Sequence, residues 1–392
     1  MQFLDIFKKQ NLDRLNSHGN LIRRLFMYAT VIISLFISLT LNFDQAYKHS
    51  PGAQKIASES LLNGEMSLLP NSYKHGIVVQ RNVFVIPKLM LPNLEYEKFR
   101  KIWMFVLIFI SSLIISEIAL NYYGGIGGIL AIVPTVTYVL FENFNALFFS
   151  NLYWLGFLPA LSLIILFYAN TLKKIFWLSF VTGALWFLRG YEYATWFGLL
   201  LVTPFIFKLA KKEMLLSVFF RHCFAAFLGF LMAFLVVLSM HGVLLYGEVE
   251  NFQETFMNMI SKRVIGAETN ISCFNVSVGS DFRRWLTKDD GLYFGNLMHY
   301  LVSIILLLTV YRLYRSKLRK DASQLVFALV SCGLWGLVAS VSWYFAAFYH
   351  SSCHHHLNDI LYLFPSGIFF TSAVFVLAIE LGLTKLVGNK WP

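Results

Sequence analysis

The sequence predicts an all-α integral membrane protein, because it is strongly apolar, carries few charges and concentrates its apolar residues in long runs. Of its 392 residues, 57% are hydrophobic and 14% are charged, whereas a soluble domain carries about 25% charged residues. Phenylalanine is abundant, with 39 residues, and bulky aromatic side chains suit lipid-facing surfaces and membrane interfaces. The runs are long enough for about ten transmembrane helices.

The first run, LFMYATVIISLFISLTLNF, follows a polar segment over residues 1–24. We interpret the run as a retained signal anchor and the polar segment as a cytoplasmic amphipathic tail. The other predicted spans cover approximately residues 102–120, 125–142, 152–170, 175–189, 192–210, 222–246, 296–314, 324–349 and 358–383. Two long loops, 44–101 and 247–295, separate some of them. The whole chain, 1–392, is therefore predicted to be a single polytopic membrane domain.

The basic residues predict the orientation of the helices. Lys173 and Lys174 fall in one predicted loop, and RLYRSKLRK in another, whereas the short loops near 143–151 and 350–357 contain no Lys or Arg. Because short cytoplasmic loops are basic, we expect both termini to be cytoplasmic and both long loops to be extracytoplasmic. The net charge of +11 then reflects topology, and we expect no nucleic-acid partner. A bacterial inner membrane is the predicted location.

A histidine-rich segment, YHSSCHHHLND, lies between the last two predicted spans and contains His350, His354 and His356, followed by Asn358 and Asp359. If the preceding helix continues to residue 354, two of the imidazoles lie four residues apart on one face. Three interpretations remain open: a transition-metal site, phosphate binding or proton transfer to a leaving group, and hydrogen bonding to helix-end carbonyls. The final aspartate is also a candidate N-cap of the last helix.

A second polar turn, FLRGYEYATW, contains Arg189, Tyr191, Glu192 and Tyr193 on the same predicted side of the membrane. Tyrosines beside an arginine and a carboxylate are typical of a sugar or phosphate site. The alternative is that Arg189 and Glu192 form a simple helical pair of little energetic value.

Other polar groups lie near the same side, with Asp44 directly after the first span and Lys74 in the first long loop. The middles of the predicted spans are nearly free of ionisable groups, with His241 as an exception. Secondary transporters usually place such groups at mid-depth, so this pattern disfavours transport.

The signal-anchor helix, the long outer loop that begins near Asp44 and the roughly ten helices together resemble the GT-C membrane glycosyltransferases. The pattern His350-Ser351-x-x-His354-x-His356-x-Asn358 also resembles a signature of uncharacterised bacterial membrane proteins. GT-C enzymes often carry paired acidic residues in the first loop, whereas here Asp44 is followed by Gln45. No metal ligand set is predicted, although a divalent metal is compatible with the resemblance.

The resemblance implies a sugar donor linked to polyprenyl phosphate and a glycan or lipid acceptor of the cell envelope, such as lipopolysaccharide, with membrane lipids as surroundings. It implies an inverting reaction with Asp44 as the catalytic base and Glu192 as its substitute. The donor phosphate would be bound by Arg189, His350, His354 and His356. The expected substrate-binding residues are Tyr191, Tyr193, Lys74, Asn358 and Asp359.

Two other functions fit the sequence. An O-antigen or capsule repeat-unit polymerase uses a lipid-linked donor and commonly has two large outer loops, as this chain does. A transporter or flippase shares the polytopic architecture.

Overall fold

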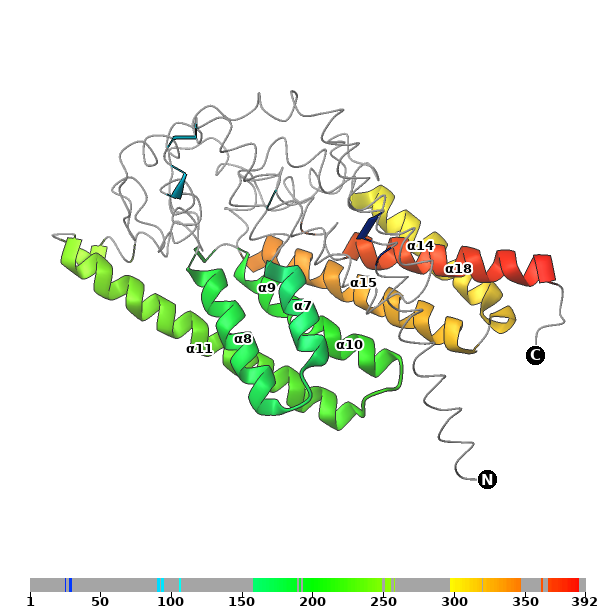
Figure 1. Cartoon of the computed structure of the whole chain (residues 1–392), viewed down its shortest axis with the longest axis horizontal. Coiled ribbons are helices and arrows are strands. Elements are labelled where there is room, and N and C mark those ends of the chain that lie inside the picture. The colour runs from blue at the N-terminus through cyan, green and yellow to red at the C-terminus, as the bar shows by residue number, and fades with distance from the viewer. Residues whose placement is uncertain are drawn as a thin grey trace.

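A computed structural model describes residues 158–188, 190–191, 193–248, 251–254, 297–318, 320–346 and 366–387, with positions 25, 28–29, 90–91, 93–94, 106, 257 and 361. Regular structure in these residues is helical throughout, as predicted. The elements are α7 (Leu158–Tyr168), α8 (Leu172–Phe187), α9 (Ala194–Leu200), α10 (Thr203–Ala210), α11 (Leu216–Glu248), α14 (Leu297–Tyr314), the 3₁₀ turn η4 (Arg315–Lys317), α15 (Lys320–Ala346) and α18 (Ile368–Val387), shown in Figure 1.

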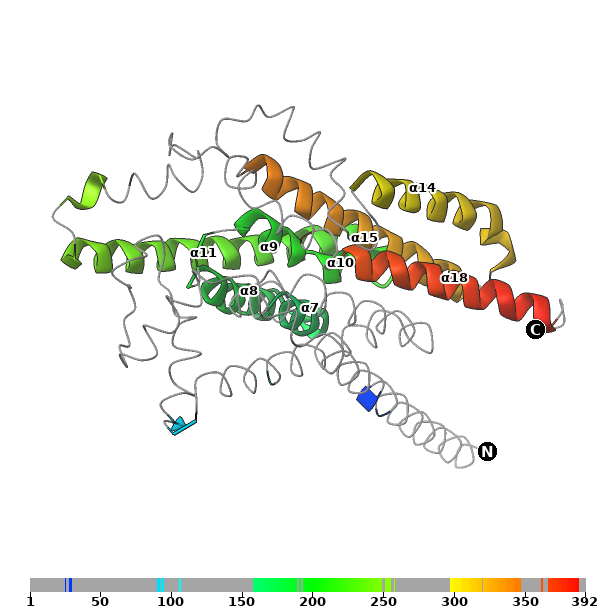
Figure 2. The same cartoon turned by 90° about the horizontal axis from the view of Figure 1, so that it is seen from above.

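The helices form two packed groups joined by a broken helix. Helix α8 packs along α11, and α15 packs along α18, while α9 and α10 contact α15. In Figure 2 α11 and α8 lie on one side of α15, and α14 lies on the other. The described part of the chain is therefore a helical bundle with one continuous buried core.

Two of these helices are long and apolar enough to cross a membrane, α11 and α15. Helix α11 has 33 residues, which corresponds to about 50 Å of rise, whereas a bilayer core is about 30 Å thick. It exposes a stripe of large apolar side chains, which includes Phe220, Phe224, Phe227, Leu231 and Leu235. A water-soluble helix normally turns such a stripe toward a core, so this surface indicates contact with lipid.

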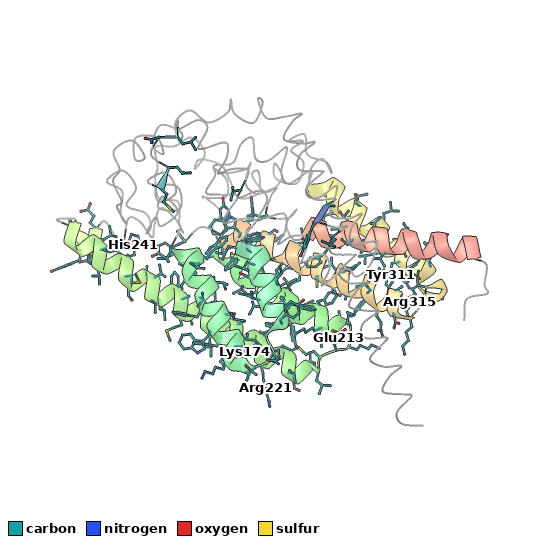
Figure 3. The ribbon with its side chains drawn as sticks, viewed as in Figure 1. Lys174, Glu213, Arg221, His241, Tyr311 and Arg315 are labelled. Carbon is teal, nitrogen blue, oxygen red and sulfur yellow. The ribbon has the colours of Figure 1, made fainter. Side chains whose placement is uncertain are left out.

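Every Lys and Arg within the described residues lies toward the same end of the bundle, which we call the basic end. It comprises the α7–α8 turn, the α10–α11 connection and η4. Figure 3 places Lys174, Arg221 and Arg315 toward this end and His241 far from it. The opposite end, which we call the turn end, carries the α8–α9 turn and the C-terminal ends of α11 and α15.

The basic residues differ from the prediction in one respect, because many belong to helices and not to loops. Lys173 and Lys174 form the first turn of α8, which begins at Leu172 behind the N-cap Thr171. The Thr171 Oγ1 accepts a hydrogen bond from the Lys174 backbone N–H at 3.3 Å. Side-chain capping satisfies an orphan N–H of the first turn, so the helix starts before its apolar run.

Glycines allow α8 and α11 to approach closely. A Cβ on Gly229 of α11 would lie 2.2 Å from the backbone oxygen of Phe176 in α8. A Cβ on Gly183 of α8 would lie 2.9 Å from the Phe230 ring and 3.0 Å from the Ala233 Cβ. Small residues at such crossings are typical of helices that pack within a membrane.

The predicted span 192–210 is not one continuous helix, because it breaks between α9 and α10 at Leu201 and Val202. Pro204 occupies the first turn of α10 and has no backbone N–H to continue the α9 hydrogen bonds. Next to it, the Leu199 carbonyl accepts from the Val202 N–H at 3.1 Å and from the Trp335 Nε1 of α15 at 2.7 Å. The break is thus held against α15.

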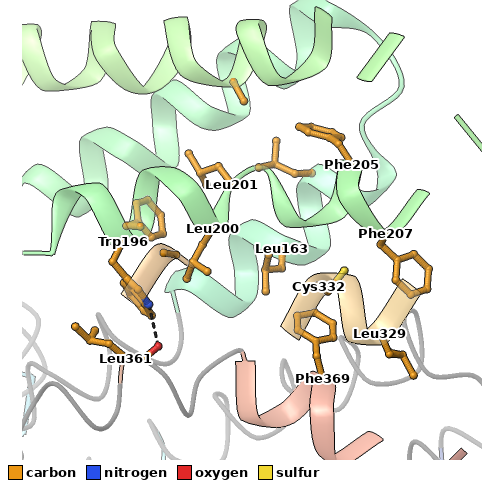
Figure 4. Close-up of a cluster of buried hydrophobic side chains, with 14 of the residues drawn as sticks. Leu163, Trp196, Leu200, Leu201, Phe205, Phe207, Leu329, Cys332, Leu361 and Phe369 are labelled. Carbon is orange, nitrogen blue, oxygen red and sulfur yellow. Dashed lines mark hydrogen bonds between the residues drawn. The ribbon is translucent and has the colours of Figure 1, made fainter. Parts of the chain in front are cut away.

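The core fills the space between this broken helix, α7, α15 and α18. Figure 4 shows Phe207 beside Leu329 and Cys332, with Phe369 below Cys332 and the Trp196 indole directed at Leu361. The Phe205 ring points the other way and lies 5.3 Å from that of His222 in α11. Helices α15 and α18 meet where the Ser366 Oγ donates to the Gly333 carbonyl at 2.6 Å. The core therefore fixes α9 relative to the C-terminal helices, which matters for the site.

Candidate functional site

The α8–α9 turn (residues 188–193) lies at the turn end, and its backbone is strained at Tyr193. Tyr193 has φ 58° and ψ 22°, the left-handed conformation that bulky residues rarely adopt and that costs about 1–2 kcal/mol. Its side chain is only 1% exposed, and its ring lies 4.7 Å from that of Trp343 in α15. Packing therefore holds a conformation that the local sequence alone would not favour, and such strain is frequent at functional sites.

Tyr191 of the same turn is joined to α11. Its hydroxyl lies 3.1 Å from the Nδ1 of His241, and the two rings are nearly parallel with centroids 5.9 Å apart. Phe187 and Phe234 line the tyrosine ring at 6.0 Å and 5.8 Å. Burial raises the pKa of Tyr191 above its ordinary value of 10.0. The phenol therefore keeps its proton and suits donation to Nδ1 of a neutral imidazole.

The tryptophans on either side of this turn form its base. Trp186 stacks on Phe197 with ring centroids 4.3 Å apart and an interplanar angle of 6°. Trp196 lies 5.9 Å from Trp186, and both tryptophans are fully buried. They support the turn from below and present no indole face at the surface.

The chain next to the histidine-rich segment is attached to the same place. The Leu361 carbonyl accepts from the Trp196 Nε1 at 3.0 Å (Figure 4) and from the Ser340 Oγ at 2.7 Å. Leu361 follows Asp359 by two residues, and Trp343 precedes His350 by seven. Both described borders of the histidine-rich segment therefore contact the start of α9, directly after the Arg189–Tyr193 turn.

Of the predicted site residues, the structure describes Tyr191 and Tyr193. Tyr191 is partly exposed, and Tyr193 is buried against Trp343. The others lie outside the described residues: Asp44, Lys74, Arg189, Glu192, His350, His354, His356, Asn358 and Asp359.

The structure adds two residues to the site that the sequence did not assign to it. His241 is fully buried, and its partner Tyr191 is 50 residues away in the sequence, so no local spacing reveals the pair. Trp343 follows Gly336 and Ser340 on one face of α15, at the small-residue spacing where helices approach closely. That spacing is a signal for a packed face and does not identify the aromatic partner.

Within the described residues, no group of three or more His, Cys, Asp or Glu side chains is placed to hold a metal ion. The site therefore consists of a strained aromatic turn, a tyrosine–histidine pair and the two borders of the histidine-rich segment.

In comparisons with known proteins, no family model, curated protein or solved structure matches this chain.

Proposed function

We propose that this protein is a membrane glycosyltransferase that moves a sugar from a polyprenyl-phosphate carrier to a cell-envelope glycan or lipid. The observation that carries the proposal is the attachment of both borders of the histidine-rich segment to α9, through Tyr193–Trp343 and Trp196–Leu361. The arginine turn and the histidines would then face one extracytoplasmic hollow.

The orientation of the site follows from the charges. Because cytoplasmic segments are enriched in Lys and Arg, the basic end would face the cytoplasm of a bacterial inner membrane. The turn end, with Tyr191 and Tyr193, would then face the opposite side, where lipid-linked sugars are used by GT-C enzymes. A multi-pass chain with both termini in the cytoplasm completes this topology.

The depth of His241 fits a headgroup site better than a transport site. It lies nine residues from the middle of α11 toward the turn end, or about 13 Å along the helix axis. Coupling ions in secondary transporters bind near the midplane of the bilayer. The tyrosine–histidine pair would instead lie near the level of lipid phosphates.

The reaction needs a base, a group that stabilises the leaving phosphate and a place for the isoprenoid chain. We assign the base to Asp44, with Glu192 as the substitute; it takes the proton as the acceptor hydroxyl attacks the anomeric carbon. The bond from that carbon to the phosphate oxygen breaks, and the configuration inverts. Arg189, His350, His354 and His356 would stabilise the charge that grows on the polyprenyl phosphate. Exposed apolar faces such as that of α11 offer surface for the isoprenoid chain.

Reconstituted full-length protein tests the proposal with a panel of polyprenyl-phosphate sugars, with release of polyprenyl phosphate as the readout. Arg189→Gln should lower turnover by about a hundredfold or more, as expected for loss of a charge-stabilising donor. Arg315→Gln, which removes the same charge at the basic end, is the matched control and should retain activity. Asp44→Asn should nearly abolish transfer while the protein still inserts into the membrane.

Two outcomes contradict the proposal at different levels. Unchanged turnover in Asp44→Asn removes the base assignment only. If the wild-type protein shows no turnover and does not bind polyprenyl phosphate, the assignment as a glycosyltransferase is itself wrong. Transfer of whole oligosaccharides, with loss of polymer in a deletion strain, would identify the repeat-unit polymerase instead.

A further inference from the structure

The basic end carries a group of cations on three neighbouring helix ends. Lys173 and Lys174 lie in the first turn of α8, Lys212 is the second residue after the end of α10, and Arg221 lies in the second turn of α11. We call these four exposed side chains the basic patch. Figure 3 shows Lys174 and Arg221 at the same edge of the bundle.

Packing brings these three helix ends together. Gly229 of α11 contacts the Phe176 backbone of α8, two residues after Lys174. The Phe205 ring of α10 lies 5.3 Å from that of His222, which directly follows Arg221. The Lys208 ammonium of α10 donates to the Phe167 carbonyl of α7, just before the α7–α8 turn. The patch is therefore part of the packed bundle and not a set of unrelated surface charges.

The charge of the basic patch is not neutralised by neighbouring described groups, because these groups have other partners. Lys208 lies over the Phe167 ring at 4.9 Å and is turned inward by its hydrogen bond. Glu213, which directly follows Lys212, forms an ion pair with Lys211 at 2.6 Å. Within the described residues, the four patch cations form no ion pair.

Large exposed apolar side chains adjoin the cations of α8 and α11 and continue toward the turn end. Trp177 is 51% exposed one turn after Lys173, and Val181 follows it on α8. Phe220 and Phe224, 61% and 62% exposed, flank Arg221 on α11. On α8 the order toward the turn end is cation, aromatic ring and aliphatic side chain, the order of groups in a lipid from phosphate to acyl chain. On α11 exposed apolar side chains lie on both sides of Arg221.

We propose that the basic patch binds the phosphate headgroup of an anionic membrane lipid, whose acyl chains lie against the exposed faces of α8 and α11. The complement of four cations that form no ion pair within the described part of the chain is a lipid phosphate, because a soluble anion would make no contact with the exposed aromatic and aliphatic residues beside the charges. This site faces away from the turn end, so it is independent of the proposed sugar transfer.

Native mass spectrometry and lipid titration of the purified full-length protein test the site with phosphatidylglycerol, phosphatidylcholine and free glycerol 3-phosphate. Each cation near an anionic headgroup contributes roughly a fivefold factor in affinity. The combined variant Lys173→Gln, Lys174→Gln and Arg221→Gln should therefore bind phosphatidylglycerol on the order of 100-fold more weakly. The control variant Arg312→Gln, Arg315→Gln and Lys320→Gln loses three exposed cations at the same end and should bind as the wild type does.

Three results would overturn the proposal. The first is equal affinity of the wild type for phosphatidylglycerol and phosphatidylcholine. The second is an equal loss of phosphatidylglycerol affinity in the two triple variants. The third is competition by glycerol 3-phosphate at the concentrations at which the lipid binds, which would indicate a soluble phosphate ligand. If the triple variant does not fold, Lys174→Gln and Arg221→Gln are measured singly. Each should lower phosphatidylglycerol affinity roughly fivefold, and unchanged affinity in both would contradict the site.

Discussion

The hydroxyl of Tyr191, in the α8–α9 turn, lies 3.1 Å from the Nδ1 of His241 on the long helix α11. A buried imidazole in an apolar helix needs a hydrogen-bond partner, since an unsatisfied polar group costs about 1–3 kcal/mol. The pair thus connects the turn that contains Arg189 and Glu192 in its sequence to α11, the more apolar of the two candidate membrane-spanning helices.

Tyr191→Phe should destabilise the protein by about 1 kcal/mol, because it removes one hydrogen bond to a buried group. It should also lower sugar transfer, since the turn loses its connection to α11. Tyr311→Phe is the matched control: its hydroxyl is 3.1 Å from the Ser323 Oγ at the basic end. The control should lose similar stability in mixed-micelle unfolding and keep its transfer rate.

A double-mutant cycle with His241→Leu measures the contact itself. The coupling free energy between Tyr191→Phe and His241→Leu should be about 0.6 kcal/mol or more, as for hydrogen bonds between membrane helices. Additive effects of the two substitutions would show that the contact does not contribute to stability.

Gly229→Ala should destabilise the bundle by about 1–3 kcal/mol, the usual cost of overpacking. The added Cβ would lie 2.2 Å from the Phe176 carbonyl oxygen, which belongs to a backbone that cannot rotate away, so α8 and α11 must separate.

Gly382→Ala in α18 is the control for helix propensity, because nothing lies within 4 Å of its added Cβ. It should stabilise the protein by about 0.5–1 kcal/mol. Equal effects of the two alanines on the free energy of unfolding would contradict the close approach of α8 and α11.

The sequence predicted the helices best where apolar runs are long and uninterrupted. The predicted spans 222–246 and 324–349 correspond to α11 and α15, and 296–314 nearly coincides with α14. The break after α9 was missed although Pro204 marks it, because a long apolar run outweighed one helix-breaking residue. Apart from position 106, the spans expected at 102–120 and 125–142 lie outside the described residues.

The site was less predictable than the helices, because its contacts join residues far apart in the chain. The Trp196–Leu361 hydrogen bond spans 165 residues, and the left-handed conformation of Tyr193 depends on packing against Trp343. Hydropathy and local motifs located the polar turn but contain no information about these partners.

Lys212→Gly should stabilise the protein by up to about 1 kcal/mol. Lys212 has φ 62°, and it occupies the position after α10 where glycine is usual. Its N–H donates to the Leu209 carbonyl at 2.9 Å, and the next N–H donates to the Lys208 carbonyl at 2.8 Å, the two bonds of a Schellman cap. Glycine adopts this conformation without the steric cost that a Cβ imposes.

Lys212→Ala separates the backbone effect from the loss of charge. It removes the ammonium but keeps the Cβ, so it should show no stabilisation in the same unfolding measurement. Both substitutions remove a cation of the basic patch and should weaken phosphatidylglycerol binding roughly fivefold. If Lys212→Gly does not raise the free energy of unfolding above that of Lys212→Ala, the left-handed backbone at position 212 carries no steric cost.

Cysteines placed in the α8–α9 turn and in the histidine-rich segment should cross-link. Trp343 and Leu361 both contact the start of α9, and the chain between Ala346 and Leu361 is only 14 residues long. We therefore expect the histidine-rich segment to lie within reach of the turn. In a background without the 4 native cysteines, Arg189→Cys with Ser352→Cys should react with a short bifunctional maleimide. Ser352→Cys with Lys211→Cys, at the basic end, should not. Two results would contradict this prediction: cross-linking of position 352 to 211 as efficient as to 189, or no cross-linking to either position. Either result would mean that the arginine turn and the histidines do not share the hollow on which the proposed sugar transfer depends.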